Sequence, residues 1–273
     1  MLYVVPTPIG NLSDITLRAK ETLENCDFVA AEDTRVGGKL LMLLGIKKPL
    51  VSFHEHSPRR VTDSIVARIA AGESCALITD AGTPAVSDPG EKLVAACAEA
   101  GLPVCALPGA CAAVTALSAS GLPGKRFCFE GFLPEKASER AERIAELTRE
   151  KRNFIIYIAP HDIASTLSEL SASLGGRRAV LAKELTKLHE KYFRGTLQEI
   201  CETALALPPE ELRGEYVLTV EGMPENEEFW KNMSVPEHVE HYIALGLSKM
   251  DACKQAARDR GVGKGEIYAE INK

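Results

Sequence analysis

The chain has 273 residues, with 32 Lys and Arg against 38 Asp and Glu, a formal net charge of −6, and 45% hydrophobic residues. This composition excludes a disordered chain, a collagen and a small disulfide-rich protein. No apolar run approaches the ~20 residues that span a bilayer, and the opening segment has the pattern of a strand, so we expect neither a membrane anchor nor a signal peptide. A single core stops growing at roughly 250–300 residues, which predicts one large domain or two ordinary ones.

Short apolar segments alternate with helical patterns over the first 120 residues. The predicted strands are Leu2–Val5, Phe28–Ala31, Leu50–Phe53, Cys75–Ile78 and Pro103–Leu107. Between them we expect a helix capped by Asp14, a helix with Val61, Ile65 and Ile69 on one face, and a helix over Glu91–Ala100. This alternation is typical of a mostly parallel sheet with helices on both faces, and predicts a first α/β domain over residues 1–122.

A second α/β domain is predicted for residues 123–222, after the break at Gly121–Gly124. Its predicted strands are Phe127–Phe129, Asn153–Ile158, Ala179–Lys183 and Tyr216–Val220, and its helices are Glu135–Glu150 and one that starts at Asp162. Residues 223–273 form a predicted extension: an acidic linker through Pro224–Pro236, a helix over Leu247–Arg260, a Gly turn and a last short helix. The two helices around a Gly turn resemble a helix-turn-helix.

The eight cysteines contain no CxxC pair and lie mostly in apolar contexts. This pattern favours buried, reduced thiols in a cytosolic protein over a zinc site or a disulfide framework. His54 and His56 lie close in sequence, but no further metal ligands accompany them, so we predict no metal site.

Three loops that follow predicted strands are rich in Gly and Pro: residues 6–11, 79–90 and 108–113. Ligands of parallel α/β sheets bind at the carboxyl ends of the strands, where Gly lets the backbone approach a ligand and helix N-termini point amide donors at it. Three such loops predict a binding cleft. The absence of GxxxxGK[ST] and of a strand-linked GxGxxG argues against ATP and NAD. Asp80 and Asp88 in the second loop suit a cationic or hydroxyl-rich ligand.

Several motifs together resemble the ribosomal RNA small subunit methyltransferase I family, over essentially the whole chain. They are Val4–Leu12, Ala30–Arg35, Asp80–Pro84 with Ser87–Gly90, Leu107–Gly109, Glu130–Pro134 and Ala182–Lys187. The resemblance implies a two-domain tetrapyrrole-methylase-like fold that binds S-adenosylmethionine in a cleft between the domains. It implies 2′-O-methylation of a cytidine ribose in the 16S rRNA of the 30S subunit, by a cytoplasmic homodimer.

The resemblance also implies which residues surround the cofactor. They are Pro8, Gly82, Thr83, Val86, Ala112 and Ala113 from the first domain, and Tyr157, Leu185, Gly214 and Glu215 from the second. One stretch departs from the family, whose members usually read Tyr-Glu-x-Pro-His-Arg. Ile158 stands here for the Glu and Asp162 for the Arg, so no role of those two side chains carries over.

A ribose hydroxyl is a poor nucleophile and needs a proton acceptor. The candidates in this sequence are His54, Asp33, Glu184 and Lys187, of which Glu184 and Lys187 are expected one helical turn apart. Glu32, Arg35 and His56 are candidate RNA contacts, although the cluster Glu32, Asp33 and Arg35 is equally consistent with pairing between the domains. Lys254 and Arg258 share a face of the last long predicted helix, which suits phosphate contacts.

Two other functions remain open from the sequence. A C-methyltransferase of tetrapyrroles shares the fold, but the Glu32–Arg35 motif and the helical extension favour the rRNA family. The changes at Ile158 and Asp162 leave open a non-catalytic nucleotide-binding regulator.

Overall fold

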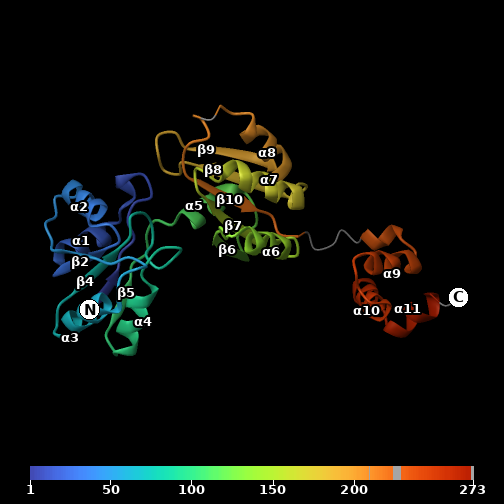
Figure 1. Ribbon diagram of the computed structural model, residues 1–273, viewed down its shortest axis with the longest axis horizontal. Coiled ribbons are helices and arrows are strands. Elements are labelled where there is room, and N and C mark those ends of the chain that lie inside the picture. Colours follow the sequence, from blue (N-terminus) through green and yellow to red (C-terminus); the bar gives the residue numbers. More distant parts are fainter. Residues whose placement is uncertain (209, 224–228, 272–273) are drawn as a thin grey trace. The chain divides into compact units, whose positions relative to one another are not determined.

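The computed structural model describes residues 1–208, 210–223 and 229–271, which divide into two compact units (Figure 1). The first unit, Met1–Gly222, contains two five-stranded sheets. The second unit, Met223–Lys273, is helical in its described part. Residues on both sides of position 122 belong to the first unit, and the domain boundary at that position stays a prediction.

The first sheet is parallel throughout and has the order β3-β2-β4-β1-β5. Its strands are β1 (Leu2–Val4), β2 (Phe28–Ala31), β3 (Leu50–Ser52), β4 (Cys75–Ile78) and β5 (Val104–Ala106). Helices α1 (Leu17–Asn25) and α2 (Thr34–Leu43) pack on one face, and α3 (Arg59–Ala70) and α4 (Glu91–Glu99) on the other. The predicted parallel sheet with helices on both faces is confirmed.

Two local features of this half differ from the sequence prediction. Asp14 does not cap the first helix, because it lies in a 3-10 turn, Leu12–Asp14. Thr16 is the cap, and its Oγ1 accepts a hydrogen bond from the Ala19 amide at 3.0 Å. Helix α2 was not predicted because Gly37 and Gly38 weaken its helical pattern. Gly37 is needed there, since a Cβ would lie 2.9 Å from the Cβ of Ala31.

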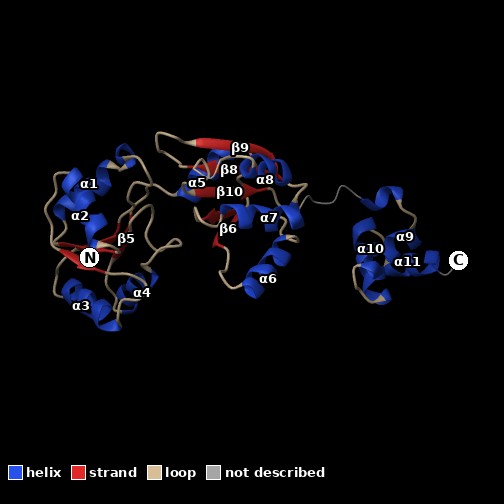
Figure 2. Cartoon of the chain, turned by 45° about the horizontal axis from the view of Figure 1, so that its top comes forward, coloured by secondary structure: helices blue, strands red, loops and turns tan. Residues whose placement is uncertain are grey.

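The second sheet is mixed and has the order β6-β7-β10-β8-β9. Its strands are β6 (Phe127–Phe132), β7 (Asn153–Ile158), β8 (Arg178–Lys183), β9 (Lys191–Thr196) and β10 (Tyr216–Val220). In this sheet β6 and β7 pair in parallel, and the other described pairs are antiparallel. Helices α6 (Ala137–Leu147), α7 (Ile163–Leu174) and α8 (Leu197–Leu205) cover one face (Figure 2). Strand β9 was not predicted because it lies at the sheet edge and is too polar to form an apolar run.

Helix α5 (Ala112–Ser120) lies on the opposite face of this second sheet. Ala113, Ala116 and Leu117 pack there in one cluster with Ile155 of β7 and Val217 of β10. Helix α5 therefore precedes the predicted domain boundary at residue 122 in the sequence, although it packs against the second sheet. Small Ala and Ser residues let α5 lie close to the strands, and the same residues leave it with little amphipathic pattern to detect.

The second unit contains a 3-10 turn (Phe229–Asn232), α9 (Val235–Ala244), α10 (Lys249–Arg260) and α11 (Lys264–Ile271). His238 is completely buried between α9 and α10. Its Nδ1 accepts from Arg260 Nε at 3.0 Å, so its Nε2 carries the proton and donates to Asp259 Oδ2 at 3.1 Å. Helix α9 was not predicted and lies almost entirely beyond the predicted linker Pro224–Pro236. Residues 224–228 of that linker lie outside the described residues.

No helix in the described ranges is long and apolar enough to cross a lipid bilayer. The eight cysteines are all free thiols, and Cys26, Cys75 and Cys97 are buried.

Candidate functional site

The three Gly- and Pro-rich loops lie side by side because β4, β1 and β5 are neighbours in the first sheet. The Thr7 amide donates to the Gly82 carbonyl at 2.8 Å, and the Gly82 amide donates back to Thr7 at 3.0 Å. Thr83 Oγ1 donates to the Ala110 carbonyl at 2.9 Å. Two backbone hydrogen bonds and one side-chain hydrogen bond therefore join the loops after all three strands.

The middle loop, residues 79–90, has an unusual backbone. Gly82 has a φ of +85°, and Ala85 and Ser87 both have a φ of 65°. A left-handed conformation at a residue other than Gly costs of order 1–3 kcal/mol and persists where the surroundings over-determine it, often at functional sites. The neighbouring loops supply those surroundings here.

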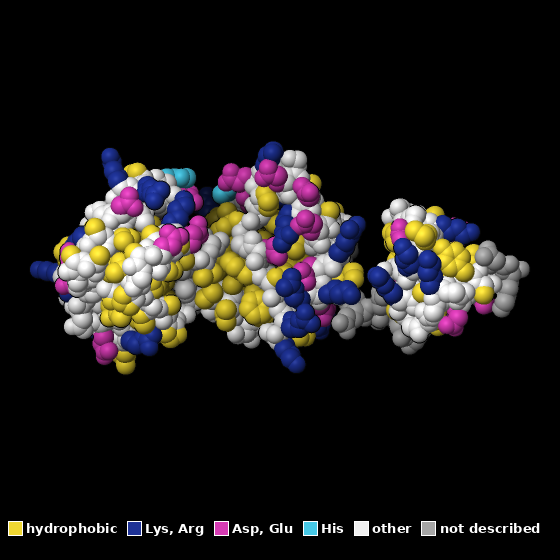
Figure 3. Space-filling view, turned by 90° about the horizontal axis from the view of Figure 1, so that it is seen from below, with side chains coloured by type: hydrophobic (Ala, Val, Ile, Leu, Met, Phe, Trp, Pro, Cys, Tyr) yellow, Lys and Arg dark blue, Asp and Glu magenta, His cyan; other side chains and the backbone are white. Residues whose placement is uncertain are grey.

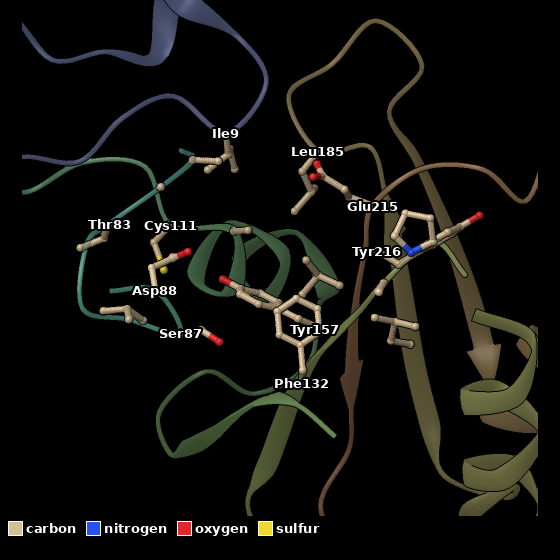
Figure 4. A pocket seen from close by; sticks show the side chains of 18 residues that line it. Ile9, Thr83, Ser87, Asp88, Cys111, Phe132, Tyr157, Leu185, Glu215 and Tyr216 are labelled. Carbon is tan, nitrogen blue, oxygen red and sulfur yellow. The ribbon is translucent and has the colours of Figure 1, made fainter. Parts of the chain in front are cut away.

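A cavity opens between these loops and the second sheet (Figure 4). The first sheet's loops line it with Ile9, Ala81, Gly82, Thr83, Val86, Ser87, Asp88, Cys111 and Ala112, and the second sheet's side lines it with Phe132, Tyr157, Ile158, Ala159, Pro160, Leu185, Glu215, Tyr216 and Val217. We call it the main cavity. Its charged lining residues, Asp88 and Glu215, are both acidic, and Lys and Arg do not occur among the described residues that line it. This lining suits an apolar ligand that carries positive charge.

Tyr157 connects the two sides of the main cavity. Its hydroxyl oxygen accepts a hydrogen bond from the Ala113 amide at 3.1 Å, at the N-terminus of α5. Its ring makes edge contacts with Phe129 and Phe132, at centroid distances of 4.9 and 5.6 Å. Burial, with a smaller effect of Cys111, raises the pKa of Tyr157 to about 12. The phenol is therefore neutral near pH 7, and it acts as a hydrogen-bonding wall of the cavity.

Four predicted site residues meet where β8 ends and β10 begins: Glu184, Lys187, Gly214 and Glu215. Lys187 Nζ donates to Glu184 Oε1 at 2.9 Å and to Glu215 Oε2 at 2.8 Å. Burial lowers the pKa of Lys187, but these hydrogen bonds together outweigh it and raise the pKa above its ordinary value. Residues 184–190 form turns, so the expected helical spacing of Glu184 and Lys187 is wrong; Glu184 has a φ of 52°.

Gly10 lets the first loop touch this cluster. A Cβ on Gly10 would lie 2.5 Å from Lys187 Cγ and 2.9 Å from the Leu185 carbonyl. No side chain fits there, so Gly10 is required by the close approach of the two halves rather than by its φ.

A second cavity adjoins the main one. Its lining includes Glu32, His54, Glu55, Glu91 and Lys92, and it shares Ser87 and Asp88 with the main cavity. Burial, followed by repulsion from the carboxylate of Glu32, raises the pKa of Asp88 to about 6. Glu32 itself accepts a hydrogen bond from Thr79 Oγ1 at 2.7 Å.

Most of the predicted cofactor residues lie together. Gly82, Thr83, Val86, Ala112, Tyr157, Leu185 and Glu215 line the main cavity. Ala113 lies beside it through its bond to Tyr157, and Gly214 precedes Glu215. Pro8 points elsewhere and lines a separate hollow with Gly10 and Asp80.

The predicted catalytic and RNA-contacting residues are more scattered. His54 and Glu32 line the second cavity. Asp33 binds Arg35, whose side-chain hydrogen bonds lower the pKa of Asp33 to about 2. Asp33 bonds to Arg35 and to Asp80, and Glu32 bonds to Thr79 and Asp80, so the printed partners of this cluster belong to the first sheet's half. Whether the cluster serves the substrate site or pairing between domains stays a prediction. His56 is exposed and lies 3.0 Å from Glu55. Lys254 and Arg258 belong to the helical second unit.

The two departures from the family pattern differ in position. Ile158 lines the main cavity and adds to its apolar wall. Asp162 stands at the start of α7, where its side chain makes no capping hydrogen bond. His161, beside it, is 82% exposed.

Several lining residues were not named individually as cofactor contacts from the sequence, among them Ile9, Ser87, Cys111 and Phe132. Asp88 was noted as a carboxylate in a Gly- and Pro-rich loop, but nothing in the sequence separates it from Asp80. Only the fold turns Asp88 toward the cavities and Asp80 toward the hollow beside Pro8.

Comparison with known proteins finds extensive similarity. Residues 1–201 match the profile of the tetrapyrrole (corrin/porphyrin) methylases. The ribosomal RNA small subunit methyltransferase I of Halalkalibacterium halodurans is 45% identical over 271 residues, which is 98% of this chain and 93% of that protein. The proteins of the same name from Bacillus subtilis and Synechocystis are 42% and 43% identical, over 98% of this chain and 92% and 96% of their own lengths.

Solved structures of lower identity share the fold. The methyltransferase CobJ aligns with a TM-score of 0.58 at 19% identity, covering 81% of this chain and 93% of that one. Uroporphyrin-III C-methyl transferase from Thermus thermophilus, complexed with S-adenyl homocysteine, aligns with a TM-score of 0.54 at 17% identity, covering 81% and 96%.

The raised pKa of Asp88 predicts how Asp88→Asn changes stability with pH. A carboxyl group whose pKa is higher in the folded state favours folding when protonated, below about pH 4, and loses that contribution as the pH rises through about 6. At pH 7.5 we expect the variant to be more stable than the parent by about 1–2 kcal/mol, because solvent screens part of the shift. At pH 4 the two should coincide. Urea unfolding at both pH values measures this difference. Asp63→Asn, at an exposed position of α3, is the control, and we expect no comparable gain in stability at pH 7.5. A variant less stable than the parent at pH 7.5 contradicts the prediction.

Proposed function

The chain belongs to the tetrapyrrole methylase family and to the family of its relatives named ribosomal RNA small subunit methyltransferase I, and from this premise we propose that it methylates the 2′-hydroxyl of a cytidine ribose in the 16S rRNA of the 30S subunit. The protein is an S-adenosylmethionine-dependent rRNA methyltransferase; the cytidine, the 2′-oxygen and the assembled subunit are the finer proposal. The observation that carries it is the main cavity, where three joined loops face an aromatic and apolar wall.

The main cavity fits S-adenosylmethionine. When bound, this molecule supplies an electrophilic methyl group on a positively charged sulfur. Gly82, Thr83 and Ala112 offer backbone and small side chains, and Tyr157 and Leu185 offer apolar surface. The acidic pair Asp88 and Glu215 favours a cation, whereas a polyphosphate would meet carboxylates and no basic partner among the described lining residues.

The polar groups beside this cavity supply candidate contacts for RNA. We propose that the ribose approaches through the second cavity, past Glu32 and His54. Arg35 and His56, whose side chains are exposed, are candidates for contacts with the surrounding RNA. Lys187 is held protonated between Glu184 and Glu215, so we assign these residues to positioning rather than to proton removal. Asp33, bonded to Arg35, caps helix α2 and also has a positioning role.

The alternative functions have less support. Similarity to uroporphyrin methyltransferases lies at 17–22% identity, which carries the fold alone. The relatives at 40–48% identity carry the rRNA methyltransferase name. The same methyltransferase name among these relatives also counts against a non-catalytic regulator. We further propose a cytoplasmic homodimer, as the family resemblance implies; buried reduced thiols fit a reducing compartment.

The function is tested with tritiated S-adenosylmethionine and 30S subunits from a strain that lacks the modification. We expect label in a 2′-O-methylcytidine, identified by nuclease digestion and mass spectrometry. The assembled subunit should react faster than naked 16S rRNA, because a protein of net charge −6 depends on a preformed surface for docking. Equal rates on both substrates contradict the docking argument, and label on a base carbon or nitrogen contradicts the ribose.

Gly82→Val tests the cofactor site. The left-handed φ of +85° strains any L side chain, and a Cβ would already be in contact with Ile9 at 3.4 Å, so the two methyl groups of Val add bulk among the loops that line the cavity. We expect the affinity for S-adenosylmethionine to fall by at least about 100-fold, roughly 2.7 kcal/mol, measured by calorimetry. Gly45→Val is the control, because Gly45 has a similar φ of +75° but open space around it. If Gly82→Val folds and binds like the Gly45 variant, Gly82 does not belong to the site.

The basic face of the second unit is a candidate RNA-docking surface. Residues 249–264 carry Lys249, Lys254, Arg258, Arg260 and Lys264 against Asp251 and Asp259. Figure 3 shows Lys and Arg side chains on one face of this unit. Arg260 does not contribute to this surface, because its guanidinium binds His238 and the carbonyls of Trp230 and Met233. Arg258 is exposed, and Lys254 pairs with Asp251 at 2.8 Å on the helix surface.

We expect Lys254→Glu with Arg258→Glu to weaken binding to 30S subunits and to flatten its salt dependence, because lost phosphate contacts release fewer counterions. The slope of log K against log salt should fall by about 1–2, with S-adenosylmethionine affinity unchanged. Lys47→Glu with Lys48→Glu in the first unit is the control of equal charge change. If both double variants lose the same affinity and slope, net charge explains the effect and the helical unit does not dock.

A further inference from the structure

The main cavity and the second cavity meet at a single pair of residues, Ser87 and Asp88. Both belong to the middle loop after β4, and Ser87 has a φ of 65°. The Cβ of a side chain at Gly131, on β6, would lie 3.1 Å from Ser87 Oγ, so the second sheet presses on this point of the loop. Asp88 is therefore held in the wall that the two cavities share.

The second cavity has the chemistry of a site for hydroxyl groups rather than phosphates. Glu32, Glu55, Asp88 and Glu91 contribute carboxylates to its lining. Lys92, its basic side chain, donates to the Glu55 carbonyl at 3.3 Å. Carboxylates accept hydrogen bonds from ribose hydroxyls and from the exocyclic amino group of cytosine, whereas they repel a phosphate. A nucleoside turned out of its strand meets this requirement.

Among the candidates from the sequence, Asp33, Glu184 and Lys187 line neither cavity, and His54 lines the second cavity but not the main one. Lys187 is protonated, with a raised pKa, between two carboxylates. Tyr157 has a pKa of about 12 and is a neutral phenol. Asp33 has a pKa of about 2, too weak a base, and lines neither cavity. Asp88 lines both cavities and has a pKa of about 6, close to the working pH at which a general base is most effective.

We propose that Asp88 is the general base of the methyl transfer, and that the second cavity receives the target ribose with its 2′-hydroxyl against this carboxylate. The inference rests on the proposed function. The hydroxyl O–H bond breaks and its proton passes to an oxygen of Asp88. The electron pair left on the 2′-oxygen forms the bond to the methyl carbon as the bond from that carbon to sulfur breaks, which leaves a neutral thioether. Asp88 later loses the proton to solvent.

The charged groups around Asp88 set the pH at which this base works. Glu32 after β2 and Asp80 on the same loop oppose its ionisation. Tyr157 faces it from β7 and is neutral. The lining of the second cavity adds His54, Glu55, Glu91 and Lys92. A second carboxylate change therefore gives a diagnostic control: Asp80→Asn removes a repulsive charge near Asp88 without touching either cavity.

The test is single-turnover methylation of 30S subunits at saturating concentrations between pH 5 and 8. We expect the parent's rate to rise with unit slope and level off above about pH 6.

Asp88→Asn should lower the plateau by about 100-fold or more without a matching rise in the concentration needed for half-saturation. Asp88→Glu, which keeps a carboxylate, should recover part of the loss. Asp80→Asn should keep the plateau and move the rise to lower pH. A ¹³C NMR titration of the Asp88 carboxyl in the protein without S-adenosylmethionine should give a midpoint of about 6, and the midpoint of the rate should lie lower, because the bound sulfonium favours the carboxylate.

Circular dichroism and calorimetry are the controls, which should show that each variant is folded and binds S-adenosylmethionine. A plateau rate of Asp88→Asn equal to the parent's overturns the inference, and so does a flat pH profile while the NMR signal of Asp88 titrates. In both cases the parent is active and the proposed function stands. If the parent labels no 30S subunit, the proposed function fails and the assignment of Asp88 fails with it.

Discussion

The hydrogen bonds that join the loops after β1, β4 and β5 are the constraint on which the rest of the site depends. The paired bonds of Thr7 with Gly82 and the bond of Thr83 to Ala110 hold three loops against each other. With its neighbours fixed, the middle loop is held at positive φ at Ala85 and Ser87. That strained path places Asp88 in the lining of both cavities. Without these bonds the loop would relax, and the carboxylate would be free to seek solvent.

The second sheet completes the site by two close approaches. Tyr157 accepts a hydrogen bond from the amide of Ala113, so the aromatic wall is tied to the N-terminus of α5. Gly10 allows the first loop to lie against the turn that holds Lys187. Between these two contacts lies a cavity with an aromatic and apolar wall, whose described charged lining residues are both acidic. Geometry and charge thus agree on a cationic ligand with a large apolar surface, which is the chemistry of S-adenosylmethionine.

The helical second unit is stabilised differently, because a unit of about 50 residues buries too little apolar surface for a large core. Its apolar core includes Val239, Ala252 and Ile267, and a buried polar network accompanies it. Arg260 donates to His238 and to three carbonyls, and Asp259 accepts from His238. A buried charge is tolerated only when its hydrogen bonds are satisfied, so this network specifies how the turn before α9 meets the end of α10. It also explains why a basic residue in a basic stretch does not belong to the basic surface.

The sequence by itself determined the elements and the family. Strand–helix alternation predicted the parallel sheet, and the Gly- and Pro-rich segments predicted the loops that line the main cavity, because both signals are local. It missed β9 and α5, since an edge strand and a small-residue helix obtain their stability from packing partners that local pattern does not contain. It gave Asp80 and Asp88 equal standing and placed Glu184 and Lys187 on a helix. Only the tertiary structure decided that Asp88 faces both cavities and that Lys187 is held between two carboxylates, because the direction and the protonation of a side chain depend on groups distant in the chain.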